Sequence, residues 1–219
     1  NKSSKNIFIT GATGFLGSYL LKEILEKSSA NVHLLIRSKN RLDVEQRGSA
    51  LINNIYNDKA PKGILKRINL VSGDITEAGL SRETRLLKIL QDEIDEIYHC
   101  AASTSFRIPL EEARKVNVKG TANILNFAKR CYKLRKINYI STTFIIGNKE
   151  TTLTEDDLYL GQKFNNTYEQ SKFEAELLVR DCKDRNFGIA IFRPSSIVGD
   201  YYSGETTSFK MPYEPIHIF

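Results

Sequence analysis

The 219-residue sequence has few of the residues that build metal sites, disulfide scaffolds or membrane spans. Its three cysteines, Cys100, Cys131 and Cys182, lie far apart, without a CxxC pair or a nearby histidine cluster. This odd, scattered set excludes a disulfide scaffold and a zinc site, so we expect a reducing, cytoplasmic environment and no metal. No run reaches the roughly eighteen apolar residues of a membrane helix, and no signal peptide precedes the first predicted strand. Because the chain begins at Asn1, we expect it to be part of a larger multidomain polypeptide.

The composition is that of an ordinary globular protein with a basic surplus. Hydrophobic residues make up 41% and charged residues 26%, which excludes a disordered tail, a collagen-like fibre and a coiled-coil rod. The net charge of +6 and the pI near 9.1 allow an acidic partner, an anionic cofactor or nucleic acid. Nucleic-acid binding has no other support, because no aromatic–basic interleaving or recognised motif accompanies the charge. We therefore expect no nucleic-acid partner.

Six short β-branched segments alternate with amphipathic ones. They are bounded by polar residues or glycine and are mostly apolar on both faces, as buried parallel strands are. These segments are residues 6–10, 32–36, 68–72, 96–100, 137–141 and 189–192. Helical periodicity covers residues 15–27, 111–131 and 168–185, and in the first of these Leu16, Leu20 and Ile24 form a stripe that Leu21 and Leu25 widen. The alternation predicts an α/β fold, a Rossmann-like doubly wound parallel sheet covered on both faces.

Two segments interrupt this alternation. Residues 149–166 are polar and acidic, which predicts a surface excursion between a strand and a helix. After Asp200 the chain becomes rich in tyrosine, glycine and threonine. We expect one Rossmann domain over residues 1–200, with residues 201–219 the start of a substrate lobe that is largely missing. Such a chain should bind cofactor but catalyse poorly, with residues 201–219 poorly ordered or packed as a fragment.

A glycine-rich segment, residues 10–17, joins the first predicted strand to the first helix. Gly11 permits a tight turn, Gly14 lets a pyrophosphate approach the backbone, and Gly17 lets the helix pack closely. Free N–H groups at the helix start then hold the phosphates. The alternative, a purely structural turn, is disfavoured by the strand–turn–helix context. The predicted dinucleotide contacts here are Thr10, Gly11, Thr13, Gly14, Phe15, Leu16 and Gly17.

Basic residues follow the second predicted strand, where NAD-binding proteins carry a carboxylate. Arg37 at this position suits the 2′-phosphate of NADP(H), and Arg47 on the following helix can add a second guanidinium. The alternative is that both are solvated surface charges. Asp74, after the third strand, can accept a hydrogen bond from the adenine amino group or cap the next turn. We expect Ile75, beside it, and Ala101, after the fourth strand, to contact the cofactor as well.

The sequence YEQSK places Tyr168 and Lys172 four residues apart, on one face of a predicted helix. A phenol with a pKa near ~10 serves poorly as an acid or base at neutral pH unless a cation favours the phenolate, and Lys172 would supply that cation. The fifth strand ends in three hydroxyl residues, one of which can bind the same substrate oxygen as the tyrosine. We predict Thr142, with Ser141 and Thr143 as close alternatives.

These features resemble the extended short-chain dehydrogenase/reductase superfamily, which combines a TGxxGxxG turn with a Ser/Thr–Tyr–Lys set. The superfamily also has an asparagine on the fourth helix that helps order a proton-relay water, and Asn117 matches it. Arg193 and Pro194, after the sixth strand, match as cofactor-binding residues. The segments LLIRS, HCAAST, NVKGT, YISTTFIIG and FRPSSIVGD are similar to the thioester reductase branch. That branch comprises terminal reductase domains of nonribosomal peptide and polyketide synthetases, carboxylic acid reductases and fatty acyl-CoA reductases.

The resemblance implies an NADPH-dependent reductase that converts an acyl thioester to an aldehyde, with a second reduction to the alcohol left open. The thioester would be carried by CoA or by the phosphopantetheine arm of an acidic carrier protein. One alternative is a sugar-nucleotide epimerase or dehydratase, which commonly has an acidic residue after the second strand and would prefer NAD. The other is a non-catalytic NADP-sensing protein, which usually lacks the tyrosine and lysine.

Overall fold

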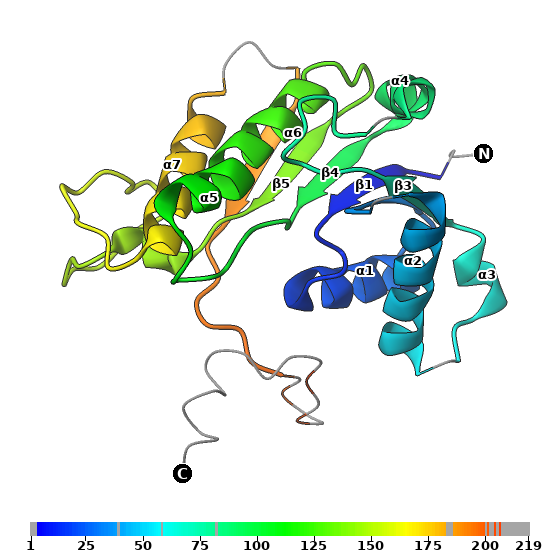
Figure 1. Ribbon diagram of the computed structural model, residues 1–219, viewed down its shortest axis with the longest axis horizontal. Helices are drawn as coiled ribbons and strands as arrows, with labels where there is room; N and C mark the ends of the chain where they lie inside the picture. Colours follow the sequence, from blue (N-terminus) through cyan, green and yellow to red (C-terminus); the bar gives the residue numbers. More distant parts are fainter. Residues whose placement is uncertain are drawn as a thin grey trace.

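A single sheet of six parallel strands, in the order β3-β2-β1-β4-β5-β6, forms the centre of the molecule (Figure 1). The computed structural model describes residues 4–38, 40–57, 59–81, 83–182 and 186–199, with Tyr201, Gly204 and Thr206. The strands are β1 (Asn6–Thr10), β2 (Asn31–Ile36), β3 (Ile68–Ser72), β4 (Glu96–His99), β5 (Lys136–Ile140) and β6 (Gly188–Phe192). The strand order reverses beside β1, as in doubly wound dinucleotide-binding folds. This confirms the predicted fold class, with strand limits within one residue of prediction.

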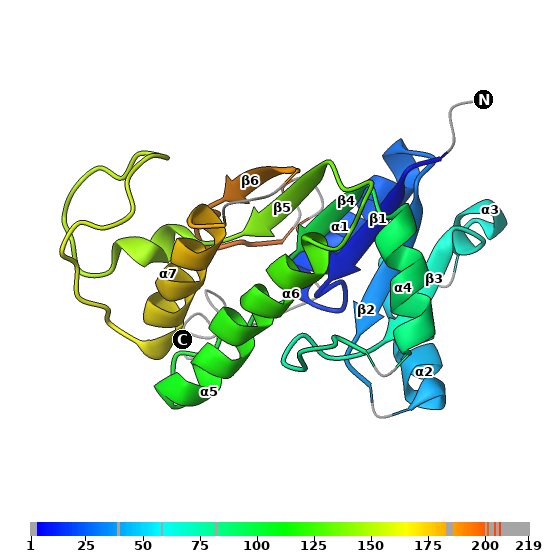
Figure 2. The same cartoon turned by 90° about the horizontal axis from the view of Figure 1, so that it is seen from above.

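Helices cover both faces of the sheet (Figure 2). On one face lie α1 (Phe15–Lys27) and α2 (Arg41–Tyr56), with the short α3 (Lys62–Leu65) leading into β3. On the other lie α4 (Thr84–Glu93), α5 (Leu110–Arg114), α6 (Gly120–Ala128) and α7 (Thr167–Arg180). A π-helical turn, η1 (Lys115–Lys119), joins α5 to α6, and a 3-10 turn, η2 (Thr143–Ile146), follows β5. The chain therefore has the three-layer architecture that βαβ crossovers produce.

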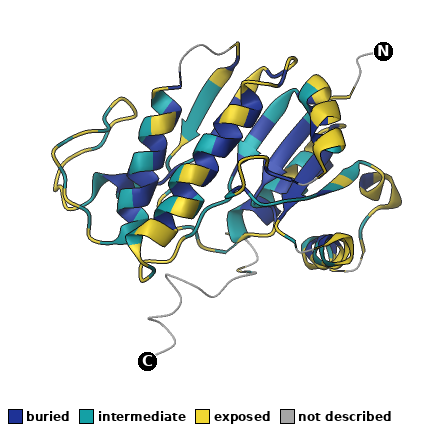
Figure 3. Ribbon diagram, turned by 45° about the horizontal axis from the view of Figure 1, so that its top comes forward, coloured by how far each residue is buried: buried dark blue, intermediate teal, exposed yellow. Residues whose placement is uncertain are grey.

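Alternating side chains of the strands enter two separate cores. On β1, Ile7 and Ile9 pack toward α1 and α2, whereas Phe8 packs toward α4, α6 and α7. Figure 3 shows the buried strands between helices whose outer faces are exposed. The central strands β1, β2, β4 and β5 are largely buried in the way expected of a parallel sheet, whereas the edge strands β3 and β6 are mostly half-buried.

The buried face of α1 is displaced by one position from the predicted stripe. Gly17, Ser18, Leu21 and Leu25 are buried, while the expected centre of the stripe (Leu16, Leu20 and Ile24) is only half-buried. The cause lies at Gly17, where a Cβ atom would stand 2.1 Å from the Gly11 carbonyl oxygen. The helix backbone therefore lies directly against the turn at this residue, which rotates the Gly17 side of the helix inward.

Two predicted helices also end differently. The segment expected to be one helix over residues 111–131 contains α5, η1 and α6 and ends at Ala128. The segment expected over 168–185 is α7, which ends at Arg180. Residues 149–166, all described, contain no helix or strand, which confirms the predicted excursion. Of the predicted lobe start, residues 201–219, all but Tyr201, Gly204 and Thr206 lie outside the described residues.

Within the part of the chain that the structure describes, no helix is both long enough and apolar enough to cross a membrane.

Candidate active site

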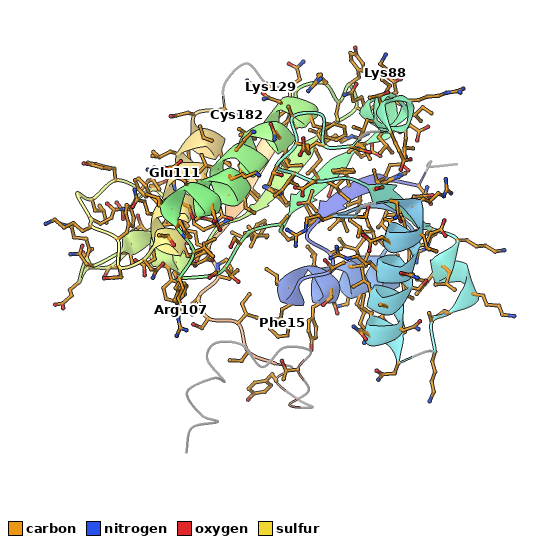
Figure 4. The ribbon with its side chains drawn as sticks, viewed as in Figure 1. Phe15, Lys88, Arg107, Glu111, Lys129 and Cys182 are labelled. Atoms are coloured by element: carbon orange, nitrogen blue, oxygen red, sulfur yellow. The ribbon has the colours of Figure 1, made fainter. Side chains whose placement is uncertain are left out.

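A cavity of about 740 Å³ opens at the carboxyl ends of the central strands. It is lined by the glycine turn and by residues that follow β4, β5 and β6, together with the first turns of α7. Figure 4 shows Phe15 and Arg107, two lining residues, at this end of the molecule, and Lys88 and Lys129 at the opposite end. Among the described lining residues the charged ones are Arg107 and Lys172, both basic. The cavity thus suits an anionic occupant.

The glycine turn has the shape that a phosphate group needs. Gly11 has a φ of +76°, and a Cβ atom there would stand 2.5 Å from the backbone nitrogen of Ala101. Gly14 begins α1 without a side-chain cap, and a Cβ atom added to it would meet only the Gly11 carbonyl oxygen, at 3.2 Å. The first turn of α1, which is fully described, contains no acidic residue. The N–H groups of this turn therefore form an uncapped helix start open to the cavity, which fits a dinucleotide pyrophosphate.

Thr10 and Ala101, both expected to contact the cofactor, instead hold β1 and β4 together behind the turn. Thr10 is fully buried, and its hydroxyl is hydrogen bonded to Nδ1 of His99 at 2.7 Å and accepts from the Ala101 N–H at 3.4 Å. The neighbours of Ala101, Cys100 and Ala102, line the cavity in its place. Among the other predicted turn residues, Phe15 and Leu16 line the cavity, whereas Thr13 is exposed on the turn.

The side chain of Arg47, on α2, reaches the backbone of Arg37, which follows β2. The Arg47 guanidinium donates a hydrogen bond to the carbonyl of Arg37, and Arg37 is exposed. Asp74 accepts from the N–H of Thr76 at 2.8 Å, so it does cap the next turn, as one of its two predicted roles required.

Ile75 was expected to contact the cofactor, but its side chain is buried. Its side chain is 7% exposed, and its Cδ1 would lie 2.7 Å from a Cβ atom at Gly120. Its carbonyl accepts from the Asn123 amide at 2.7 Å. The side chain therefore fills the core under α6 instead of facing a cofactor.

Of the three hydroxyl residues after β5, Thr142 has the position that suits the predicted role. It lines the cavity with Tyr168, caps η2 by accepting from the Phe144 N–H at 3.2 Å, and donates to the Pro194 carbonyl at 3.4 Å. Its hydroxyl also lowers the pKa of Tyr168, although burial has the larger, opposite effect. Ser141 donates its hydroxyl to the buried carboxylate of Glu176. Thr143, which is not among the cavity residues, donates its N–H to the carbonyl of Pro194 at 3.0 Å.

The electrostatic prediction for Tyr168 is wrong for this structure. Burial raises the pKa of Tyr168 above its ordinary value, and the hydrogen bond with Thr142 lowers it by less. The Nζ of Lys172 contacts β5 instead, donating to the hydroxyl of Tyr139 at 3.0 Å and to the carbonyl of Ile140 at 2.7 Å. Burial lowers the pKa of Lys172 to about 8, against the opposing effect of Glu176. At neutral pH the site therefore presents a protonated phenol beside an ammonium group.

Asn117 lies in the π-helical turn η1, and its side-chain amide makes three hydrogen bonds to other residues. It accepts from the Ser103 N–H at 2.8 Å and donates to the Ser103 carbonyl at 3.0 Å and to the Ser171 hydroxyl at 2.9 Å. Ser171 in turn donates to the carbonyl of Tyr168. Asn117 therefore supports the first turn of α7. Both N–H groups of its amide are used, and one lone pair of Oδ1 remains for the expected water.

Arg193 was expected to contact the cofactor, but its guanidinium is bound to Glu176. The closest contact joins Arg193 Nη2 and Glu176 Oε1 at 2.6 Å, and the glutamate is fully buried. Arg193 also donates to the carbonyls of Thr154 and Asp157, which anchors the 149–166 excursion. Its neighbour Pro194 does line the cavity.

Sequence reasoning missed the residues that extend the cavity beyond the strand ends. The ring of Phe106 lies 5.6 Å from the ring of Tyr168, and Arg107 continues this wall. Ser195 and Ser196 line the opposite part, after β6. The segments HCAAST and FRPSSIVGD pointed to these strand ends, but no residue spacing indicated which of the following side chains turn inward.

The chain is similar to known proteins in both sequence and fold. The NAD-binding family described as male sterility protein matches residues 9–218. Fatty acyl-CoA reductase 1 of Arabidopsis thaliana is 29% identical over 214 residues, covering 85% of this chain and 44% of that protein. The terminal R domain from the myxalamid PKS-NRPS biosynthetic pathway is 31% identical with a TM-score of 0.86, over 97% of this chain and 54% of that one. A UDP-glucuronic acid 4-epimerase from Bacillus cereus, in complex with NAD, is 27% identical with a TM-score of 0.66, over 89% and 57%.

The chain spans less than half the length of the curated relatives it matches and about half of the solved chains.

Proposed function

The chain belongs to the NAD-binding family described as male sterility protein, within the extended short-chain dehydrogenase/reductase superfamily, and we propose that it reduces acyl thioesters with NADPH. The observation that carries this proposal is the single cavity in which the glycine turn meets Thr142, Tyr168 and Lys172. The likeness to a fatty acyl-CoA reductase and to the R domain supports an acyl thioester as substrate.

Thr142, Tyr168 and Lys172 have different roles in the proposed proton transfer. NADPH, held at the glycine turn, would supply the hydride. Thr142 and Tyr168 line one cavity, and the Thr142 hydroxyl affects the pKa of Tyr168, so a carbonyl oxygen bound there would lie near both hydroxyls. Because its pKa is raised, Tyr168 keeps its proton at neutral pH and can donate it to that oxygen as negative charge develops. The Lys172 ammonium contacts β5 but lines the same cavity, so it supplies a positive charge within the site when the phenolate forms.

The proposed reaction balances in two steps. The carbonyl carbon gains the hydride and its oxygen gains the Tyr168 proton, which gives a hemithioacetal. That proton then returns to the phenolate as the carbon–sulfur bond breaks, releasing an aldehyde and a thiolate that takes a proton from solvent. Each thioester therefore consumes one NADPH and one proton.

The choice of NADPH rests on Arg37 and Arg47. Arg37 follows β2, where a 2′-phosphate would lie, and the Arg47 side chain from α2 contacts its backbone, so both can contribute charge-assisted hydrogen bonds to that phosphate. The epimerase alternative predicts NAD, so titration of the protein with both cofactors separates the two functions.

We further propose that residues 201–219 begin a substrate-binding lobe and that the acyl group arrives on CoA or on an acidic carrier protein. The net charge of +6 is compatible with the second source. A longer chain that contains the lobe should reduce the same thioester with higher kcat/KM. Equal kcat/KM for both chains would place the substrate site within the present residues.

The proposed function is tested with NADPH and a panel of acyl-CoA, acyl-carrier-protein and UDP-sugar substrates, with products followed by mass spectrometry. We expect aldehyde and free thiol from acyl thioesters. Turnover of a UDP-sugar without net NADPH consumption would overturn the proposal in favour of the epimerase.

A further inference from the structure

A buried chain of hydroxyl groups behind the cavity contacts Lys172 from β5. The Nζ of Lys172 lies 3.0 Å from the hydroxyl oxygen of Tyr139 and 4.5 Å from the centre of its ring. Tyr139 is 1% exposed, and the hydroxyl of Thr121 on α6, which is 2% exposed, lies near enough to lower the pKa of Tyr139 against the larger effect of burial. Thr121 in turn donates to the carbonyl of Asn117 at 2.6 Å. Neither Tyr139 nor Thr121 lines the cavity.

The direction of these hydrogen bonds follows from the last acceptor. The Asn117 carbonyl can only accept, so the single proton of Thr121 points to it and the Thr121 oxygen is left to accept. Tyr139 accepts from Lys172 Nζ, so a lone pair of its hydroxyl faces the ammonium and its own proton points elsewhere, with the Thr121 oxygen as a nearby acceptor. His99 fits this arrangement, because burial lowers its pKa to about 3 and the neutral ring can donate from Nε2 to Thr121 at 3.1 Å. Lys172 therefore meets an acceptor that favours the ammonium form.

We propose that Tyr139, oriented by Thr121, is a positioning residue that holds Lys172 as an ammonium group with one N–H directed to the cavity. An ammonium has three N–H donors, of which two are used by Tyr139 and the Ile140 carbonyl. Lys172 lines the cavity, so the third donor is available there. The kinetic consequence of this inference rests on the proposed function, whereas the positioning itself does not.

Other groups near Lys172 do not replace Tyr139. On its own helix, Glu176 raises the pKa of Lys172 but has its carboxylate occupied by Ser141 and Arg193, and Tyr168 keeps its proton. On β4, His99 is neutral. Cys100, also on that side, raises the pKa of Lys172 as well, but burial raises the pKa of the thiol itself to about 12, so it is neutral at pH 7. Tyr139 is therefore the side chain that contacts the ammonium directly.

The test is a direct titration of Lys172 in cofactor-free protein labelled with ¹³C-lysine, using Lys172→Arg to identify the signal. In Tyr139→Phe the ring remains and the acceptor is lost, so the titration midpoint should fall by about one to two pH units. Thr121→Val should also lower it, and Thr121→Ser should restore it. Tyr98→Phe is the matched control, because it removes a tyrosine hydroxyl from the adjacent strand β4, and its midpoint should equal that of the wild type.

If Tyr139→Phe does not fold, the Thr121→Val and Thr121→Ser pair decides the matter with the same readout. Midpoints in Tyr139→Phe and Thr121→Val equal to the wild-type value would overturn the inference. In thioester reduction, the basic limb of the kcat/KM profile of Tyr139→Phe should move to lower pH by the same amount. A wild type that titrates as expected but reduces no thioester would contradict the proposed function and leave the positioning supported.

Discussion

The dinucleotide side of the cavity, at β1, α1 and β2, is built from backbone and exposed cations, whereas the chemical side, at β5 and α7, is built from buried side chains. At the glycine turn the essential feature is the lack of Cβ atoms at Gly11 and Gly17. Around α7, Lys172 and Glu176 are almost fully buried and each is bonded to groups from other elements. The first side depends on local geometry, and the second depends on long-range contacts that fix protonation states.

The largest effect should come from Tyr168 on the chemical side. Tyr168→Phe should lower kcat about 10²- to 10⁴-fold, because the proton donor is lost, and should leave NADPH affinity nearly unchanged. Steady-state kinetics and calorimetry measure both quantities. Tyr159→Phe, in the excursion and 78% exposed, is the matched control and should behave as the wild type.

Lys172 and Tyr168 should act in the same catalytic step. Because Lys172 and Tyr168 serve one step, Lys172→Ala should weaken turnover and cofactor binding, but its combination with Tyr168→Phe should be little worse than Tyr168→Phe alone. Multiplicative losses in the double variant would show that the two residues act independently.

On the chemical side, loss of the buried Glu176 carboxylate should lower the unfolding free energy more than loss of the partly exposed Glu174 carboxylate. Glu176→Gln leaves the guanidinium of Arg193 without its counter-charge and should cost about 3–5 kcal/mol of unfolding free energy. Glu174→Gln, two residues earlier on α7 and paired with the partly exposed Arg114, should cost about 1 kcal/mol or less. Urea denaturation measures the two values, and equal losses would contradict the distinction.

Glu176 should also make the stability of the protein depend on pH. Burial alone would raise the pKa of Glu176, but hydrogen bonds from Arg193 and Ser141 outweigh it and hold the pKa below 4.5. The stabilisation is therefore fully present above pH 4.5 and is lost as the pH falls through the lowered pKa. Between neutral and acidic pH, the wild type should lose more stability than Glu176→Gln.

On the dinucleotide side, Gly11→Ala should reduce stability by about 2 kcal/mol or more and weaken NADPH binding, because a Cβ atom would meet the Ala101 backbone at a φ of +76°. Gly63→Ala in α3 is the control, since a Cβ atom there has no neighbour within 4 Å. Thermal unfolding with and without NADPH compares them, and a fully stable Gly11→Ala would contradict the role of this turn.

The smallest effect should be the loss of one exposed phosphate contact. Arg37→Ala should weaken NADPH binding by about 1.5–3 kcal/mol and leave NADH binding unchanged. Arg41→Ala, whose side chain is paired with Glu45 on α2, should change neither affinity. Equal affinity of the wild type for NADPH and NADH would refute the assignment of Arg37 and Arg47.

The sequence predicted where the turn and strand-end residues lie better than it predicted the partners of their side chains. Turns and strand ends are formed by residues that are close in sequence. The spacing of residues therefore located the glycine turn, Arg37 after β2, and the Tyr168–Lys172 pair on α7. Arg193 was misplaced because its partner, Glu176, lies on a different element and only the fold brings their charges together. Tyr139 was overlooked for the same reason, since its contacts come from α6 and α7. Long-range hydrogen bonds leave no periodic signal in the sequence.

The most direct test of the account is deuterium transfer from 4-deuterated NADPH to an acyl-pantetheine thioester in a single turnover. We expect the label at the aldehyde carbon, with one thiol released for each NADPH oxidised, in the wild type, and no labelled aldehyde from Tyr168→Phe. Thiol release without labelled aldehyde, or equal labelling by Tyr168→Phe, would contradict the assignment of this cavity to thioester reduction.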